Sequence, residues 1–345
     1  MLKVLTLCSG IEAVIQGYEN LFVPHMHVAA CETDKKVRAV LQHNFDAQRL
    51  FDDICELHPS DVPDHDMMWA GFPCQPWSTC GRGQGLDDEQ GRGIIILHII
   101  RLMYVCLPKI VVLENVGGMA SKTHKDFFEA VLVLLTEIKV RGLHYEVQWQ
   151  LLDSKYFGIP QSRPRIWIIC RRSDVAERKL RWPRSHSVPC GDIDRLLGPR
   201  PPRAQVEQSL PRTPSARINA IRSLDSLRAK GIDPFNETWI MEVSQSSGRR
   251  GSMMKGCSPC LTKTRASNGG HWISTHGRFM EVGEMLELQH MRRDRINLPE
   301  GVTTRDFGGM IGNSMTVAIV EVILAMLSRA CPGVFPGELP DRWSS

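Results

Sequence analysis

The sequence lacks the features that mark membrane-spanning and secreted proteins. Its 345 residues contain no run of 18 consecutive apolar residues, and the N-terminal stretch MLKVLTL has neither a basic flank nor a small-residue cleavage site. The 11 cysteines show no framework spacing, which favours free thiols in a reducing compartment over a disulfide scaffold. We therefore expect an unsecreted protein that does not cross a membrane.

The sequence also lacks internal repeats, and its charges nearly balance. The 42 Lys and Arg residues exceed the 38 Asp and Glu residues by only 4. The basic residues are nevertheless concentrated from Arg163 to Arg228 and from Arg249 to Arg295. On charge alone, a polyanionic partner and a solvated basic face fit this distribution equally well.

Short β-branched runs alternate with amphipathic segments along the first half of the chain. The helix-like segments are Val37 to Phe45, Ile94 to Cys106 and Asp126 to Lys139. The strand-like runs are KVLTL, HVAAC, MMWA, IVVLE, VQWQLL and IWIIC. This alternation predicts an α/β fold with a doubly wound, mostly parallel sheet.

The alternation stops near Arg171, where a proline-rich and arginine-rich region begins. A smaller second domain is predicted there. The apolar segment Thr316 to Ala330 is expected to return and pack on the first domain. The predicted boundaries are 1–172 plus 276–330 for the first domain, 173–275 for the second, and 331–345 for a poorly packed tail.

Polar residues follow the first three predicted strands. Ser9 and Gly10 occupy a strand-to-helix turn, where the backbone can approach a nucleotide-like ligand. Glu32 ends the second strand about 20 residues further on, where a carboxylate can accept hydrogen bonds from ribose hydroxyls. Asp53 follows the third strand. A glycine turn can also serve packing alone, and both acids can be solvated loop residues, but their shared place at strand ends favours a ligand site.

The stretch GFPCQPWS presents a thiol after the fourth predicted strand. Gly71, Pro73 and Pro76 define a sharp loop around Cys74. An isolated cysteine is more often a buried structural residue, but such a residue needs no presenting loop. The pattern therefore favours a nucleophilic thiolate.

Acidic and basic groups follow on the next strands. Glu114 belongs to ENV at the end of the fifth strand, where a carboxyl group can act on a ring nitrogen. Arg163 and Arg165 belong to QSRPR and lie on one face of an extended segment. Their guanidinium groups can hold a base oxygen, a carboxylate or a phosphate.

Taken in order, these motifs make the chain resemble the cytosine-5 DNA methyltransferase family. The resemblance covers Val4 to Ala330 and adds to the motifs above GRGIIILHII, RFMEVGEMLELQHM and IGNSMTVAI. The sequence departs from the family pattern at Cys8, where an aromatic residue is usual, and at Glu12, where glycine is usual. These departures concern the expected cofactor turn rather than the thiol.

The resemblance implies a reaction in which Cys74 adds to carbon 6 of a cytosine that has swung out of the duplex. Glu114 would donate to ring N3, Arg165 would hold the base O2, and Arg163 would order Glu114 and nearby phosphates. Methyl transfer to carbon 5 and loss of its proton would then expel Cys74.

The same resemblance implies S-adenosyl-L-methionine as cofactor and double-stranded DNA as partner. We expect a monomer without metal, in the nucleus or, for a prokaryotic or viral protein, in the cytoplasm. The residues expected to contact the cofactor are Ser9, Gly10, Ile11, Glu32, Asp53, Ile54, Phe72, Pro73, Asn313 and Ser314.

Three other interpretations compete with this one. They are an RNA cytosine-5 methyltransferase, a catalytically inactive nucleic-acid-binding module of the same fold, and an unrelated nucleotide-binding enzyme. Phe72 and QPWS favour the DNA branch, and a binding module has no need of the thiol at Cys74. Cys257 and Cys260 form a CxxC pair, but further zinc ligands at comparable spacing are missing.

Overall fold

The computed structural model describes residues 1–73, 94–184, 188, 190–246 and 251–342. The chain forms two compact units. Unit 1 comprises Met1–Leu152, Pro164–Ser185 and Ile319–Ser345, and unit 2 comprises Asp153–Arg163 and His186–Ala318. The C-terminal segment thus returns to unit 1, as the apolar pattern predicts. The predicted domains are defined by their expected functions, whereas the two units are defined by compactness. The predicted domain boundaries therefore stay a prediction.

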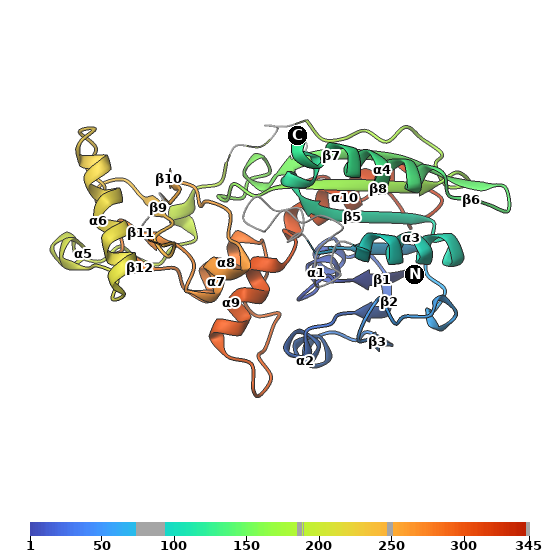
Figure 1. Cartoon of the computed structure of the whole chain (residues 1–345), viewed down its shortest axis with the longest axis horizontal. Helices are drawn as coiled ribbons and strands as arrows, with labels where there is room; N and C mark the ends of the chain where they lie inside the picture. The colour runs from blue at the N-terminus through green and yellow to red at the C-terminus, as the bar shows by residue number, and fades with distance from the viewer. Residues whose placement is uncertain (74–93, 185–187, 189, 247–250, 343–345) are drawn as a thin grey trace. The chain divides into compact units, whose positions relative to one another are not determined.

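Unit 1 is built on an eight-stranded sheet with the order β3-β2-β1-β4-β5-β8-β7-β6 (Figure 1). β1, β2, β3, β4 and β5 pair in parallel, whereas β8 runs antiparallel to β5. This confirms the predicted mostly parallel sheet. The strands are β1 (Leu2–Leu7), β2 (His25–Cys31), β3 (Leu50–Phe51), β4 (Met67–Ala70), β5 (Ile110–Val116), β6 (Lys139–Val140), β7 (Leu143–Asp153) and β8 (Pro164–Arg172).

Helices cover both faces of this sheet, which explains why its central strands are apolar without alternation. One face packs against α3 and α4, with Leu5, Met68 and Val111 among the buried side chains (Figure 1). On the other face α1 lies against α10, where a Cβ at Gly17 would lie only 2.6 Å from Cγ1 of Val320. The helices are α1 (Ala13–Asn20), α2 (Lys35–Asn44), α3 (Ile95–Cys106), α4 (Lys125–Thr136) and α10 (Val317–Ala330).

The strand order of unit 1 reverses direction at β1. The chain forms β2 and β3 on one side of β1 and then β4 and β5 on its other side. Doubly wound sheets bind ligands at such a reversal, beyond the carboxyl ends of the strands. The segments that follow β1, β2, β3 and β4 carry the residues predicted to bind the cofactor.

Unit 2 contains a smaller antiparallel sheet with the order β10-β9-β11-β12. Ala216, Ala220 and Leu224 of α6 pack against Met241 and Trp272 to form its core. The strands are β9 (Trp239–Met241), β10 (Met253–Lys255), β11 (Trp272–Ile273) and β12 (Arg278–Phe279), and the helices are α5 (Arg203–Gln208), α6 (Pro214–Arg228), α7 (Lys263–Ser267), α8 (Val282–Leu288) and α9 (Thr304–Asn313). Short 3-10 turns occur at Pro59–Asp61, Gly117–Ala120, Lys122–His124, Ser154–Tyr156 and Ile193–Arg195.

One helical stretch, Thr304–Ala330, is long and apolar enough to cross a membrane by composition. The criterion of consecutive apolar residues misses it because polar residues such as Glu321 interrupt the run. Its most apolar window is 94% buried within the protein. Such burial is typical of a core helix.

Candidate active site

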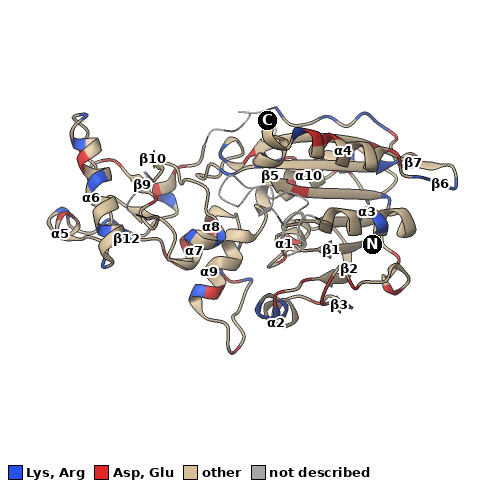
Figure 2. Ribbon diagram, in the orientation of Figure 1, with Lys and Arg blue, Asp and Glu red and all other residues tan. Residues whose placement is uncertain are grey.

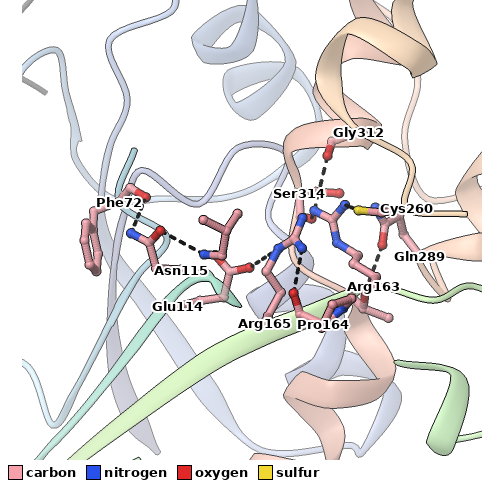
Figure 3. A network of polar contacts seen from close by, with 12 residues as sticks. Phe72, Glu114, Asn115, Arg163, Pro164, Arg165, Cys260, Gln289, Gly312 and Ser314 are labelled. Atoms are coloured by element: carbon pink, nitrogen blue, oxygen red, sulfur yellow. Dashed lines mark hydrogen bonds and ion pairs between the residues drawn. The ribbon is translucent and has the colours of Figure 1, made fainter. Parts of the chain in front are cut away.

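The root of the thiol loop is fixed by the neighbouring strand β5. Gly71 donates its backbone N–H to the carbonyl of Leu7, and Phe72 is buried. The buried amide of Asn115 donates to the carbonyl of Phe72 at 3.3 Å and accepts from the N–H of Val116 (Figure 3). Cys74 itself lies outside the described residues. The structure therefore places the chain up to Pro73, and the position of the sulfur stays a prediction.

Glu114 and Arg165 meet on one face of the sheet. In the antiparallel register of β5 and β8, Arg165 lies opposite Val116, so Glu114 is its diagonal neighbour. Nε of Arg165 lies 3.0 Å from Oε1 of Glu114, and the two side chains are only 13% and 12% exposed (Figure 3). Nη1 of Arg165 also donates to the carbonyl of Pro164. The pair gives the carboxyl group a fixed direction.

Glu114 lies inside a strand rather than after one. The sequence predicts that the fifth strand ends at this residue, but β5 continues to Val116. Pairing with β8 carries the strand on through Asn115 and Val116. Asn115 was not singled out by the sequence, although it sits in the same ENV motif, and its role in holding Phe72 emerges only from the structure.

Arg163 is buried within unit 2 and bonds to backbone carbonyls. Nη1 donates to Leu261, and Nη2 donates to Gly312 and Ser314, at 2.7, 3.2 and 2.6 Å respectively (Figure 3). The side chain is 3% exposed. These contacts tie the end of α9 to the segment before α7. The predicted action of Arg163 on Glu114 and on DNA phosphates stays a prediction, and its described contacts are structural.

The end of α9 holds the two predicted cofactor residues of the C-terminal region. Asn313 is exposed at the last position of the helix. Ser314 is buried, and its hydroxyl donates to the carbonyl of Ile311. Arg163 therefore fixes the backbone on both sides of Asn313. Both residues belong to unit 2, whereas the other predicted cofactor residues belong to unit 1.

The turn after β1 has an unusual backbone. Cys8, Gly10 and Glu12 all adopt positive φ, at 51°, 65° and 55°. No atom lies within 4 Å of a Cβ built on Gly10, so the glycine is needed for its backbone angle and not for space. Ser9 and Ile11 are buried. The side chain of Ile11 belongs to the core, so any contact of this residue with a cofactor stays a prediction.

Glu32 and Asp53 gather near this turn. Burial raises the pKa of Glu32, and backbone N–H groups, including those of Asp34 and Gly10, partly offset that effect. Asp53 accepts the N–H of Cys55, while Ile54 between them is buried. Burial raises the pKa of the Cys8 thiol, and the Glu32 and Asp53 carboxyls raise it further. The structure thus brings the ends of β1, β2 and β3 together, as the strand-end pattern predicts.

The CxxC cysteines have other partners. The thiol of Cys257 donates to the carbonyl of Ser258, and that of Cys190 donates to the carbonyl of Ile159. The neighbouring Cys257 thiol lowers the pKa of Cys190. Sγ of Cys260 accepts from Arg163 at 3.7 Å. Within the described ranges, no group of three or more His, Cys, Asp or Glu residues is arranged to hold a metal ion.

Comparison with known proteins gives a consistent result. A family profile described as C-5 cytosine-specific DNA methylase matches residues 2–329. The type II methyltransferase M.NgoBI of Neisseria gonorrhoeae is 30% identical over 97% of this chain and 95% of its own length. M.Bsp6I of Bacillus sp. strain RFL6 is 31% identical over 94% and 97%. The Entamoeba histolytica methyltransferase EhMeth shares the fold, with a TM-score of 0.66 at 15% identity over 95% of this chain and 98% of its own.

Proposed function

We propose, from the premise that this chain belongs to the C-5 cytosine-specific DNA methylase family, that it methylates cytosine through a covalent intermediate at Cys74. The protein is a DNA (cytosine-5)-methyltransferase by family. The observation that supports the covalent mechanism is the Glu114–Arg165 pair. Strands β5 and β8 hold this pair near the root of the Cys74 loop.

The carbon 5 position of cytosine is a poor nucleophile, so the ring must first be activated. The Cys74 thiolate forms a bond to carbon 6, and Glu114 donates a proton to N3 to neutralise the charge that accumulates there. Arg165 orients that carboxyl group and holds the base O2. Once carbon 5 carries the methyl group, loss of its proton re-forms the double bond between carbons 5 and 6 as the bond from carbon 6 to Cys74 breaks, and N3 returns its proton to Glu114.

A cytosine stacked in a duplex cannot reach this site. We propose that the nucleotide swings out, at a cost of a few kcal/mol for unstacking. Basic side chains of unit 2 would offset part of that cost through phosphate contacts. Figure 2 shows Lys and Arg along α6, and Arg212 and Arg217 line a cavity of about 770 Å³ beside Trp272.

The residues at the ends of β1, β2 and β3 fit S-adenosylmethionine. The Gly10 turn leaves open space beside its backbone, and the half-buried Glu32 carboxyl lies where it can accept two ribose hydroxyls. When bound, the cofactor supplies the methyl group. We assign Ser9, Gly10 and Ile11 to its methionine part, and the Phe72–Pro73 backbone to the side of the thiol loop. Asp53 with Ile54 would meet the adenine, and Asn313 with Ser314 would close the site.

Replacing Glu32 by alanine should weaken S-adenosylmethionine binding by about 1 to 3 kcal/mol, because charged hydrogen bonds to the ribose are lost. Isothermal titration calorimetry measures the change. Glu56→Ala, an exposed acid that follows β3, serves as the control and should bind as the wild type does. Equal binding by Glu32→Ala and the wild type would remove Glu32 from the site.

Bisulfite sequencing of DNA from cells that express the protein tests the proposed activity. Protected cytosines should recur in one sequence context and should be missing in cells that express Cys74→Ser. RNA from the same cells is sequenced in parallel. Protection confined to RNA would favour the RNA branch, and no protection of either nucleic acid would favour an inactive binding module.

A further inference from the structure

A buried polar cluster lies under the turn that follows β1. It consists of Thr6, Ser9, Glu12, Gln16 and His27, none more than 6% exposed. The Glu12 side chain is completely buried. A buried carboxyl group is costly unless hydrogen bonds satisfy it, so an acid at this position needs an explanation. Glycine is usual here in the family that the chain resembles, and glycine would also suit the observed φ of 55°.

A chain of hydrogen bonds runs through the cluster. Oε1 of Glu12 accepts from the hydroxyls of Thr6 and Ser9, each at 2.8 Å. The hydroxyl of Thr6 also lies 2.9 Å from Nε2 of His27, so it bridges the carboxyl group and the imidazole. The Glu12 carboxyl thus holds Ser9, one of the residues assigned to the cofactor, in a single orientation.

The second carboxyl oxygen allows Glu12 to titrate without losing these bonds. Oε2 is buried and has no hydrogen-bond partner among the described residues. A proton can reside on Oε2 while Oε1 still accepts from Thr6 and Ser9. Ionisation then strengthens both hydroxyl bonds, because charge-assisted hydrogen bonds are the stronger kind. The order of the turn is therefore linked to the charge of Glu12.

Burial sets the pH range in which the Glu12 carboxyl group ionises. It raises the pKa of Glu12 to about 7, although the hydroxyls of Ser9 and Thr6 oppose the shift. Burial, together with nearby His25, lowers the pKa of His27 to about 4. His27 is thus neutral where Glu12 titrates. Acids on neighbouring elements include Glu321 of α10, which accepts from Asn20, Glu32 after β2 and Asp53 after β3.

We propose that Glu12 is a positioning residue of the cofactor site, which holds the Ser9 turn in place and couples cofactor binding to the release of a proton. This inference rests on the proposed function, since it takes the turn to be the S-adenosylmethionine site. The cofactor carries a positive sulfonium, and a nearby cation favours the ionised form of a carboxyl group. The stronger bond to Ser9 acts in the same direction.

The expected pH dependence of binding has a definite sign. Below pH 7 the free protein carries a proton on Glu12, and binding must expel it. Affinity therefore rises with pH until Glu12 is ionised in the free protein. If only the ionised form binds, the dissociation constant falls about tenfold between pH 6 and pH 8, in proportion to the ionised fraction.

Stability without cofactor should change in the opposite direction. A folded-state pKa above the unfolded value means that the native state holds the proton more tightly. The contribution of Glu12 to the free energy of unfolding is fully present at a pH below its unfolded-state pKa. It is lost as the pH rises through the folded-state pKa of about 7. The unfolding temperature of the wild type should therefore fall relative to that of Glu12→Gln between pH 5 and pH 8. A merely structural acid of ordinary pKa gives no such trend.

Calorimetry at pH 6, 7 and 8 in two buffers of different ionisation enthalpy tests the proposal. The wild type should bind S-adenosylmethionine more tightly as the pH rises and should release up to one proton at pH 6. Glu12→Gln should release no such proton, and its affinity should change little with pH. We assign any remaining pH dependence to Glu32. Glu321→Gln, a second buried acid of unit 1, should behave as the wild type does.

The outcomes separate this inference from the proposed function. A wild type that binds the cofactor with no proton release overturns the role of Glu12, as does a Glu12→Gln protein with an unchanged slope. A wild type that does not bind at any pH overturns the proposed function instead. The proton count needs no variant, so the test stands even where Glu12→Gln fails to fold. Glu12→Gly then provides a second comparison.

Discussion

Cys74→Ser should form no covalent complex with DNA that contains 5-fluorocytosine, while the wild-type protein is trapped. Fluorine at carbon 5 cannot leave as a proton does, so elimination stalls with the enzyme attached. A serine hydroxyl ionises far less readily than a thiol and attacks carbon 6 much more slowly. We expect methylation to fall by roughly 10⁴-fold or more, since loss of a nucleophile removes the whole covalent route. Denaturing gels and mass spectrometry of the adduct measure both effects.

Cys80 provides the matched control for this experiment. It lies six residues further along the chain and has no assigned role. Cys80→Ser should be trapped as efficiently as the wild type, and trapping should require the cofactor. An adduct located on Cys80, or near-normal methylation by Cys74→Ser, would refute the mechanism and make Cys74 a structural residue.

Glu114→Gln should lower the rate of methyl transfer by about 10²- to 10⁴-fold, the range typical of a lost general acid. Arg165→Met should also slow the reaction, because the Glu114 carboxyl then loses the 3.0 Å contact that orients it. The two substitutions remove parts of one unit. The double variant should therefore lose less than the sum of the two single effects, with a coupling energy of about 1 to 3 kcal/mol. Single-turnover kinetics with saturating cofactor supply the four rates.

An ion pair at the other end of β8 provides the control for the general effects of replacing an arginine. Arg172 contacts Asp174 at 2.7 Å, near the opposite end of the same strand. Arg172→Met should leave the rate of methyl transfer unchanged. Strictly additive losses at Glu114 and Arg165 would show that the pair does not act together. A normal rate in Glu114→Gln would assign the proton donation to another group.

Local patterns predict much of unit 1 because each strand and helix carries its own signal. KVLTL and HVAAC are mostly apolar on both faces, as is typical of buried parallel strands, and they lie within β1 and β2. The same patterns fail at the ends of elements. The sequence ends the fifth strand at Glu114, but pairing with β8 extends β5 to Val116. A strand end is decided by its partner, which lies far away in sequence.

Side-chain orientation is a second property that the local pattern does not decide. QSRPR places Arg163 and Arg165 two positions apart in an extended segment, which predicts that they share one face. The structure sends them to different partners, Arg165 to the Glu114 carboxyl and Arg163 to carbonyls of unit 2. The chain passes from unit 2 to unit 1 between Arg163 and Pro164, so the alternation of a single strand does not apply across both residues.

The sequence by itself determined the parallel sheet, the family and the set of polar residues at the strand ends, because apolar periodicity and motif order are written in consecutive residues. Only the tertiary structure decided what these residues touch. In the sequence, Glu12 is only an acid at a position where glycine is usual. In the structure, β2 brings His27 against Thr6, and the carboxyl group is enclosed. Burial then moves its pKa to about 7. Burial and long-range pairing arise from packing between distant segments, and no local pattern encodes them.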